Sequence, residues 1–213
     1  MKKKKNKKII PKDPTSKGVV NLMFEFGILA KTPRSGFHFL GTGEQSVAEH
    51  VSRAVFISYL LAMMDGTVDV LTVLKMSLLH DISETRISDL NYVHQKYVDR
   101  KEHDAIKHIS DSIPFGKDIF DTIHEYEARE SKESILVKDA DNLEWILSLK
   151  EEADQGNTRA WEWCVKASAR LVTKQAKMIV KEILSVDSTD WFQNKKVVMS
   201  YKDKLKKQHN PHV

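Results

Sequence analysis

A largely apolar stretch, residues 68–79, leads directly into His80-Asp81, and Glu84 follows about one helical turn later. On a helix of 3.6 residues per turn, Glu84 would lie on the face between His80 and Asp81. Burying an imidazole and two carboxyl groups without partners costs several kcal/mol. We therefore expect these groups to be paired with one another or bound to a metal ion. A helix cap with an exposed aspartate is the other interpretation of a single His-Asp dipeptide.

Apolar residues recur at helical spacing along the chain, and no stretch alternates with the period of two that is typical of strands. They make up 41% of the 213 residues, which is enough for the core of one domain. We predict an all-α fold, a single helical bundle of about six or seven helices over residues 17–192. The expected helices cover residues 18–30, 47–64, 68–84, 92–112, 118–130, 134–149 and, as one long helix, 159–184.

The net charge of +4 comes from the first eight residues, six of which are lysines. The rest of the chain holds 28 basic against 30 acidic residues, so it offers no basic face that would track nucleic acid. We predict a flexible Lys-rich arm at residues 1–16, a frayed basic tail at 193–213, and no binding of nucleic acid. A nucleic-acid binder that uses the lysine arm is the alternative.

Cys164 is the single cysteine, which excludes an internal disulfide and a zinc site built from several thiolates. No signal-peptide pattern and no run of about 20 apolar residues is present. The sequence therefore predicts a cytoplasmic protein that does not bind a membrane.

Further histidine and aspartate residues stand on two other predicted helices. Ser46 and Glu49 have the spacing of a capping box, which places His50 in the first turn of the helix that follows. Asp139 and Asp141 are embedded in the apolar helix 134–149. They point about 200° apart, so only one can face a given site, and the periodicity does not choose between them.

Two histidines and two carboxylates from three helices would form a site for one divalent transition metal ion, with Mn, Fe, Co, Ni and Zn all compatible. Such an ion keeps positions for water and for a phosphoryl oxygen, as metal-assisted hydrolysis requires. The loop 31–46 adds Arg34, which could meet an anionic group, and Phe37, which could pack against a flat ring. A solvated arginine and a core aromatic residue are the alternative for this loop.

Four blocks of sequence carry these residues in order: residues 33–37, 44–50, 80–90 and 136–144. In this order and in local detail, the chain resembles the HD-domain metal-dependent phosphohydrolases over about residues 18–192. Within that family it is similar to the branch that removes phosphate from deoxynucleoside 5′-monophosphates.

The resemblance implies a role for eight side chains. It implies four metal ligands, His50, His80, Asp81 and Asp141, and thereby selects Asp141 over Asp139. Glu84 and Asp89 match the acidic pair that activates water and protonates the leaving 5′-oxygen, in either assignment of the two roles. Arg34 is similar to the arginine that holds the phosphate. Phe37 stands near the position where the family has a Trp beside the sugar, and Ser88 stands where the family usually has Gly.

The resemblance thus implies a homodimeric hydrolase that converts a deoxynucleoside monophosphate and water to deoxynucleoside and phosphate. One alternative is an HD phosphohydrolase that acts on another nucleotide or phosphate ester. A second is a non-catalytic nucleotide-binding scaffold that retains the fold, against which the intact ligands and both acidic residues argue.

Overall fold

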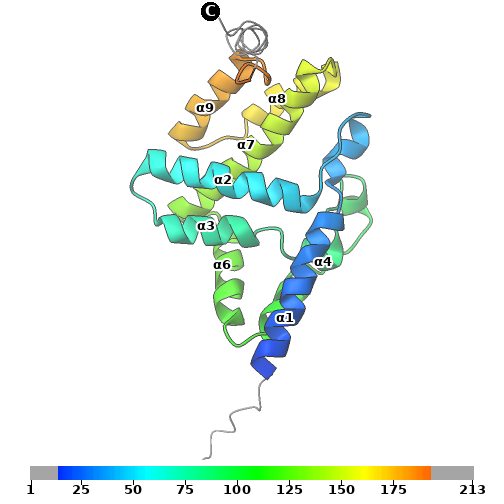
Figure 1. Ribbon diagram of the computed structural model, residues 1–213, viewed down its shortest axis with the longest axis vertical. Coiled ribbons are helices and arrows are strands. Elements are labelled where there is room, and N and C mark those ends of the chain that lie inside the picture. The colour runs from blue at the N-terminus through cyan, green and yellow to red at the C-terminus, as the bar shows by residue number, and fades with distance from the viewer. Residues whose placement is uncertain (1–13, 193–213) are drawn as a thin grey trace, which may run out of the picture.

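The computed structural model describes residues 14–192, and this part of the chain is a bundle of helices with no strand longer than an isolated bridge (Figure 1). The predicted all-α class is confirmed. Most of the predicted arm at residues 1–16 and all of the predicted tail at 193–213 lie outside the described residues. Residues 14–16, which were expected in the arm, belong to the first helix.

Eight α-helices of ten or more residues and one single-turn helix are formed by the described residues, close to the predicted number. They are α1 (Pro14–Phe26), α2 (Val47–Asp65), α3 (Val70–Leu79), α4 (Glu84–Ile87), α5 (Glu102–Asp111), α6 (Gly116–Ala128), α7 (Lys132–Asp154), α8 (Thr158–Ser168) and α9 (Lys174–Ser185). Three short 3₁₀ helices lie in the connections: η1 (Gly27–Lys31), η2 (Ser35–Phe39) and η3 (His94–Lys96).

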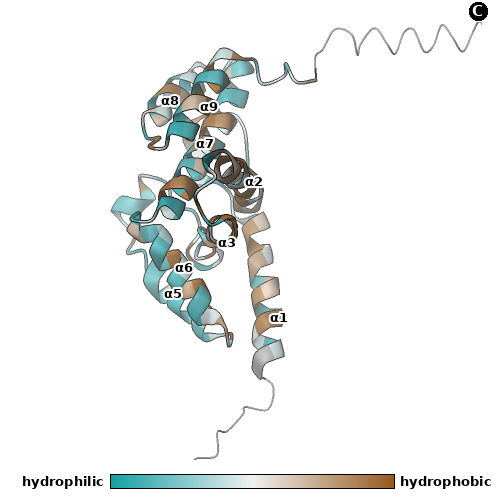
Figure 2. Cartoon of the chain, turned by 90° about the vertical axis from the view of Figure 1, so that its left-hand side faces the viewer, coloured by the Kyte–Doolittle hydropathy of each residue, from teal (hydrophilic) through white to brown (hydrophobic). Residues whose placement is uncertain are grey.

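Helix α7 is the centre of the bundle, because it packs against α2, α3, α6, α8 and α9. Its apolar side contributes Leu136, Leu143 and Leu149 to the main core, where α2 adds Leu61 and α3 adds Met76. Each of these side chains is almost fully buried, which stabilises the fold by about 1.5–3 kcal/mol per residue. Figure 2 shows the strongly apolar α2 and α3 in the middle of the molecule.

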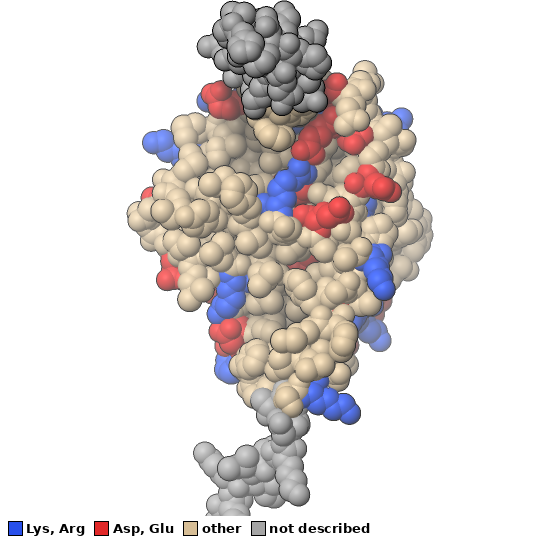
Figure 3. All heavy atoms as spheres, viewed as in Figure 1, with Lys and Arg blue, Asp and Glu red and all other residues tan. Residues whose placement is uncertain are grey.

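Helix α2 is long and apolar enough to cross a membrane by length and composition alone. Of its most apolar window, 44% is buried in the bundle, and the core helix of a soluble protein has the same composition, so this single helix is weak evidence for a span. Phe56, Met63 and Met64 remain exposed on its outer side. Figure 3 shows a mostly uncharged surface over the left-hand part of this helix. The absence of membrane binding stays a prediction.

Three of the predicted helices are wrong in extent, and one of them, the expected helix 68–84, ends at Leu79. The expected long helix 159–184 is divided into α8 and α9. The carboxylate of Asp139 accepts the backbone N–H groups of Val172 and Thr173, and the Thr173 side chain caps α9. An uninterrupted helix would engage those N–H groups in its own hydrogen bonds. The expected helix 92–112 is helical only in η3 and α5, because the Asn91 side chain accepts the N–H groups of Val93 and His94 and makes a turn there.

Candidate metal centre and adjoining cavity

His80 and Asp81 lie in a tight turn, not inside a continuous helix as the sequence suggested. Helix α3 ends at Leu79, and the backbone N–H groups of Ile82 and Glu84 bond to residues three positions earlier, Leu79 and Asp81, at 3.0 Å. Such 3₁₀-type turns are tighter than an α-helix. The turn aims both side chains at one point, and their nearest polar atoms, His80 Nε2 and Asp81 Oδ2, lie 3.2 Å apart.

Four donor atoms from three segments of the chain meet around that point. His50 Nε2, from the first turn of α2, lies 3.3 Å from His80 Nε2, 3.3 Å from Asp141 Oδ1 and 3.5 Å from Asp81 Oδ2. Donors that share one transition metal ion at about 2.1 Å lie about 3.0–3.5 Å from their neighbours. The spacing of these atoms therefore fits an ion between them, and His50, His80 and Asp141 in particular can hold one.

The hydrogen bonds on the far side of each imidazole support the same conclusion. His50 Nδ1 faces Glu144 Oε2 at 2.5 Å, and His80 Nδ1 faces the carbonyl oxygen of Ser77 at 2.7 Å. Both Nδ1 atoms are thus engaged by acceptors, which directs the two Nε2 atoms toward each other and toward two carboxylates. Burial alone would lower the pKa of His50, but Asp141 and Glu144 raise it to about 9. The carboxylates around His50 therefore favour a positive charge at its Nε2 atom, which a proton or a bound metal ion can supply.

Glu144 contacts the ring nitrogen of His50 that faces away from the other donors, and it has no exposed surface. Besides His50, it accepts hydrogen bonds from Arg53 Nε at 2.9 Å and from Gln45 Nε2 at 2.6 Å. Despite its burial, these contacts and that with His50 lower the pKa of Glu144 to about 2, so it is a carboxylate. Our sequence reasoning assigned no role to Glu144, although an acidic residue three positions after Asp141 in an apolar helix is a usable signal.

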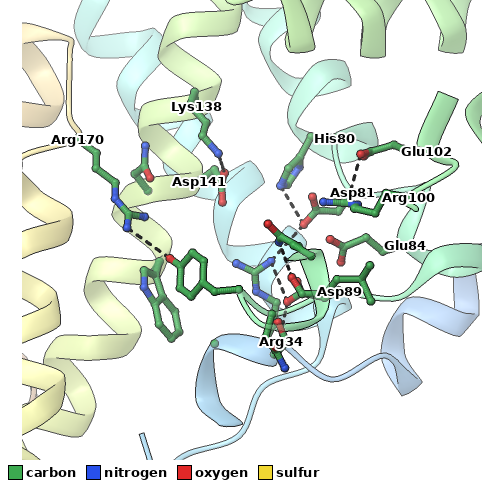
Figure 4. Close-up of a pocket in the computed structure, with 18 of the residues that line it drawn as sticks. Arg34, His80, Asp81, Glu84, Asp89, Arg100, Glu102, Lys138, Asp141 and Arg170 are labelled. Carbon is green, nitrogen blue, oxygen red and sulfur yellow. Dashed lines mark hydrogen bonds and ion pairs between the residues drawn. The ribbon is translucent and has the colours of Figure 1, made fainter. Parts of the chain in front are cut away.

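A cavity of about 400 Å³ opens beside the four donors, and Figure 4 shows side chains from several segments directed into it. The predicted residues His80, Asp81 and Asp141 line it together with Arg34, Glu84 and Asp89. His50 lies behind this wall, fully buried. Asp139 is not part of the site, because it faces the opposite side of α7 and binds the start of α9.

Arg34 and the acidic pair form one charged group in this cavity. Arg34 Nη1 lies 3.5 Å from Asp81 Oδ2 and 3.7 Å from Asp89 Oδ2, and Asp89 Oδ2 also accepts the backbone N–H of Ser35 at 2.9 Å. Glu84 is buried, and its Oε2 atom has no hydrogen-bond partner among the described residues. Burial and the charges of Asp81 and Asp89 raise the pKa of Glu84 to about 10, so it is protonated in this arrangement. A carboxyl group that is protonated inside the cavity can give a proton to a leaving group, as acid–base chemistry requires.

Phe37 does not line this cavity, although the resemblance implied a place near the sugar; its position matches the core aromatic residue that was the alternative for this loop. The 3₁₀ turn η2 directs its ring into the core, where it is 9% exposed and meets the Trp145 ring edge to face, with 5.2 Å between centroids. The cavity wall at this place is made by Gly36 and Trp145. A Cβ atom on Gly36 would lie 2.8 Å from the Trp145 ring, so this close contact requires glycine.

Ser88 adopts a backbone conformation that residues other than glycine rarely adopt. Its φ of 63° and ψ of 165° fall in a region that is populated almost only by glycine. The residue ends α4 and precedes Asp89. The change from the family's usual Gly therefore introduces strain next to a site residue.

An all-α bundle that gathers two histidines and two aspartates beside a charged cavity defines a class of helical metal-binding domain. A family model described as the HD domain matches residues 26–184, and the chain belongs to this family. The resemblance that we inferred from four sequence blocks is thereby confirmed.

Curated relatives carry a more specific name. The 5′-deoxynucleotidase HDDC2 of Danio rerio is 32% identical over 131 residues, which are 59% of this chain and 64% of that protein. The protein of the same name from Mus musculus is 25% identical over 146 residues, which are 66% of this chain and 72% of that one. The match thus spans slightly less than two thirds of the Danio rerio protein.

Solved structures share the fold. A conserved hypothetical protein from Pyrococcus furiosus is 29% identical with a TM-score of 0.68, over 78% of this chain and 99% of that one. The HD phosphohydrolase DatZ of cyanophage S-2L, bound to dA and one catalytic Zn²⁺ ion, has a TM-score of 0.50 and 18% identity, over 76% and 95% of the two chains. The latter likeness shows the fold alone.

Proposed function

We propose that the protein is a metal-dependent phosphomonoester hydrolase that removes the 5′-phosphate of deoxynucleoside monophosphates. One observation carries the proposal: four metal-type donors, an arginine and an acidic pair meet at one cavity large enough for a small molecule. The names of the curated relatives support the reaction and its substrate.

His50, His80, Asp81 and Asp141 would hold one divalent ion. When bound, such an ion supplies Lewis acidity toward a phosphoryl oxygen and lowers the pKa of water. The donor set of two nitrogens and two oxygens is compatible with Mn, Fe, Co, Ni or Zn. The zinc ion of the cyanophage enzyme is an example from the same fold.

The remaining residues orient the phosphate and move protons. The Arg34 guanidinium, now balanced by Asp81 and Asp89, would bind two phosphate oxygens in a fork and fix the phosphorus in the cavity. Water attacks phosphorus, and the bond between phosphorus and the 5′-oxygen breaks. One carboxyl group of the pair Glu84 and Asp89 takes the proton of the attacking water, and the other gives a proton to the leaving oxygen.

Phosphate release from a panel of deoxy- and ribonucleoside monophosphates tests the proposal, with chelator-stripped protein to which each divalent metal is returned. We expect release from the deoxynucleotides only after metal is added. His80→Ala and Asp81→Ala should lose both turnover and bound metal, whereas Lys75→Ala, on the outer side of α3, should keep both. Full activity in a chelator, or in His80→Ala, would contradict the proposed centre.

We extend the proposal to assembly and location: a homodimer in the cytoplasm that binds neither nucleic acid nor membranes. The resemblance to relatives supports the dimer, and the charge balance outside the first eight residues supports the absence of nucleic-acid binding. Light scattering in solution measures the assembly directly. A monomer at micromolar concentration would contradict this part of the proposal.

A further inference from the structure

One face of α7 runs along the whole cavity. Lys138, Asp141, Asn142 and Trp145 all line it, and their spacing of three, one and three residues is that of a single helix face. At 1.5 Å per residue this face extends for about 10 Å, roughly the length of a nucleoside monophosphate. Asp141 belongs to the metal donors, so Asn142 and Trp145 continue along the cavity away from the site of chemistry.

The end of the cavity beyond Asp141 is aromatic. Trp145 is joined there by Trp163 from α8 and by Tyr92 from the segment after α4. Figure 4 shows Arg170 at this end, across the cavity from Glu84 and Arg100. Arg170 Nη2 donates to the Tyr92 hydroxyl at 3.4 Å, which connects the two rims. Aromatic side chains bind heterocyclic bases by stacking, with little regard to which base it is.

Asn142 adds a polar group that can distinguish bases. The residue is only 9% exposed, it lines the cavity, and its side-chain amide forms no hydrogen bond with another described residue. An amide that lines a cavity without a protein partner is free to form hydrogen bonds with a ligand. An asparagine amide can donate to N7 of adenine and accept from its N6 amino group at the same time.

We propose that Asn142, Trp145 and Trp163 form a base-binding subsite that selects adenine, so that dAMP is the preferred substrate. Arginine is the residue that matches the two acceptors of guanine. Arg170, however, is exposed and already bonded to Tyr92, whereas the Asn142 amide lines the cavity and has no partner among the described residues, so we expect Asn142 to set the base preference. This inference rests on the proposed function.

The test compares kcat/KM for phosphate release from dAMP, dGMP, dCMP and 2-deoxyribose 5-phosphate, which lacks a base. We expect the unaltered protein to prefer dAMP at least tenfold over the abasic compound. Asn142→Leu should lose about tenfold on dAMP and nothing on the abasic compound, because a base contact of this type discriminates by about that factor. Asn21→Leu, an exposed position on α1, is the matched control and should change neither value.

Equal kcat/KM values on all four compounds, or an Asn142→Leu protein that keeps its preference, would overturn the subsite and leave the proposed hydrolysis intact. Absence of release from every nucleotide would instead overturn the proposed function. Deoxyadenosine binding, followed by tryptophan fluorescence, then decides the subsite without turnover. It should be about tenfold weaker in Asn142→Leu, and failure of the unaltered protein to bind deoxyadenosine would refute the subsite. If Asn142→Leu does not fold, the isosteric Asn142→Asp removes the same N–H donor.

Discussion

At the scale of single residues, the buried carboxylate of Glu144 fixes the ring of His50. We expect Glu144→Gln to weaken metal binding by about ten- to a hundredfold, the usual effect of losing an outer partner of a ligating histidine. Competition with a chromogenic chelator measures the affinity. Glu151→Gln is the matched control, because Glu151 also binds Arg53 but does not touch His50. Equal metal affinity in both variants would show that the Glu144 charge is not needed.

Arg34 is expected to act on the substrate in the ground state. Arg34→Ala should raise KM for a deoxynucleotide by about tenfold or more, because a charge-assisted fork to phosphate is lost. Arg34→Lys should recover part of the affinity, since it restores the charge without the fork. Steady-state kinetics at saturating metal separate KM from kcat. An unchanged KM in Arg34→Ala would remove the phosphate-binding role.

The sequence was informative for those side chains whose position depends on nearby residues. His80 and Asp81 were found because they are adjacent and follow an apolar run. Glu144 was missed because its partner His50 lies 94 positions away on another helix. The sequence left two positions open for Phe37, in the core or beside a ligand, because the 3₁₀ turn η2 that sends its ring into the core leaves no hydrophobic periodicity in a loop.

At the scale of the elements, the turn that ends α4 holds Ser88 in a glycine-type conformation. Ser88→Gly should relieve this strain and raise the free energy of unfolding by about 1 kcal/mol, net of the extra flexibility that glycine gives the unfolded chain. Thermal unfolding with metal bound measures the change. Ser83→Gly, which removes a side chain from an ordinary helical conformation in the same segment, should destabilise instead. A lower melting temperature for Ser88→Gly would argue against the strain.

Helix α7 carries two aspartates on opposite sides: Asp139 binds the start of α9, and Asp141 lies among the metal donors. They form a matched pair for mutation. Asp139→Ala should cost about 2 kcal/mol of stability, because the N–H groups of Val172 and Thr173 lose their partner, and should leave metal affinity unchanged. Asp141→Ala should instead remove the bound metal. Urea unfolding and metal analysis of the two variants together provide the comparison. Loss of metal in Asp139→Ala would reverse the assignment.

Helical periodicity was enough to predict most of the bundle, including α2, α6 and α7. It failed where a distant side chain interrupts an otherwise helical pattern. The break between α8 and α9 depends on Asp139, which lies 33 positions before Val172, and no local signal in residues 159–184 contains that contact. The periodicity also did not predict the end of α3 at Leu79, because the turn that follows is held by local backbone bonds that leave the apolar pattern unchanged.

At the scale of the whole molecule, the metal donors join α2, the turn after α3, and α7. An ion that binds only the folded chain should stabilise it by about 2.7 kcal/mol at a hundred times its Kd. For a domain of this size, chelation should therefore lower Tm by roughly 5–10 °C. Thermal unfolding with chelator, and again after metal is returned, measures the shift. An identical Tm in both states would show that the donors do not hold an ion in the folded protein.

The common face of Lys138, Asp141, Asn142 and Trp145 also limits how this chain can vary. Inserting one residue into α7 between Lys138 and Trp145 would rotate everything after it by about 100° and shift it by about 1.5 Å. Side chains before and after the insertion would then no longer face the same cavity, and they could not contact one bound ligand together. Length changes should therefore accumulate in the connections, such as the one between α7 and α8, while this segment of α7 keeps an invariant residue count among related chains.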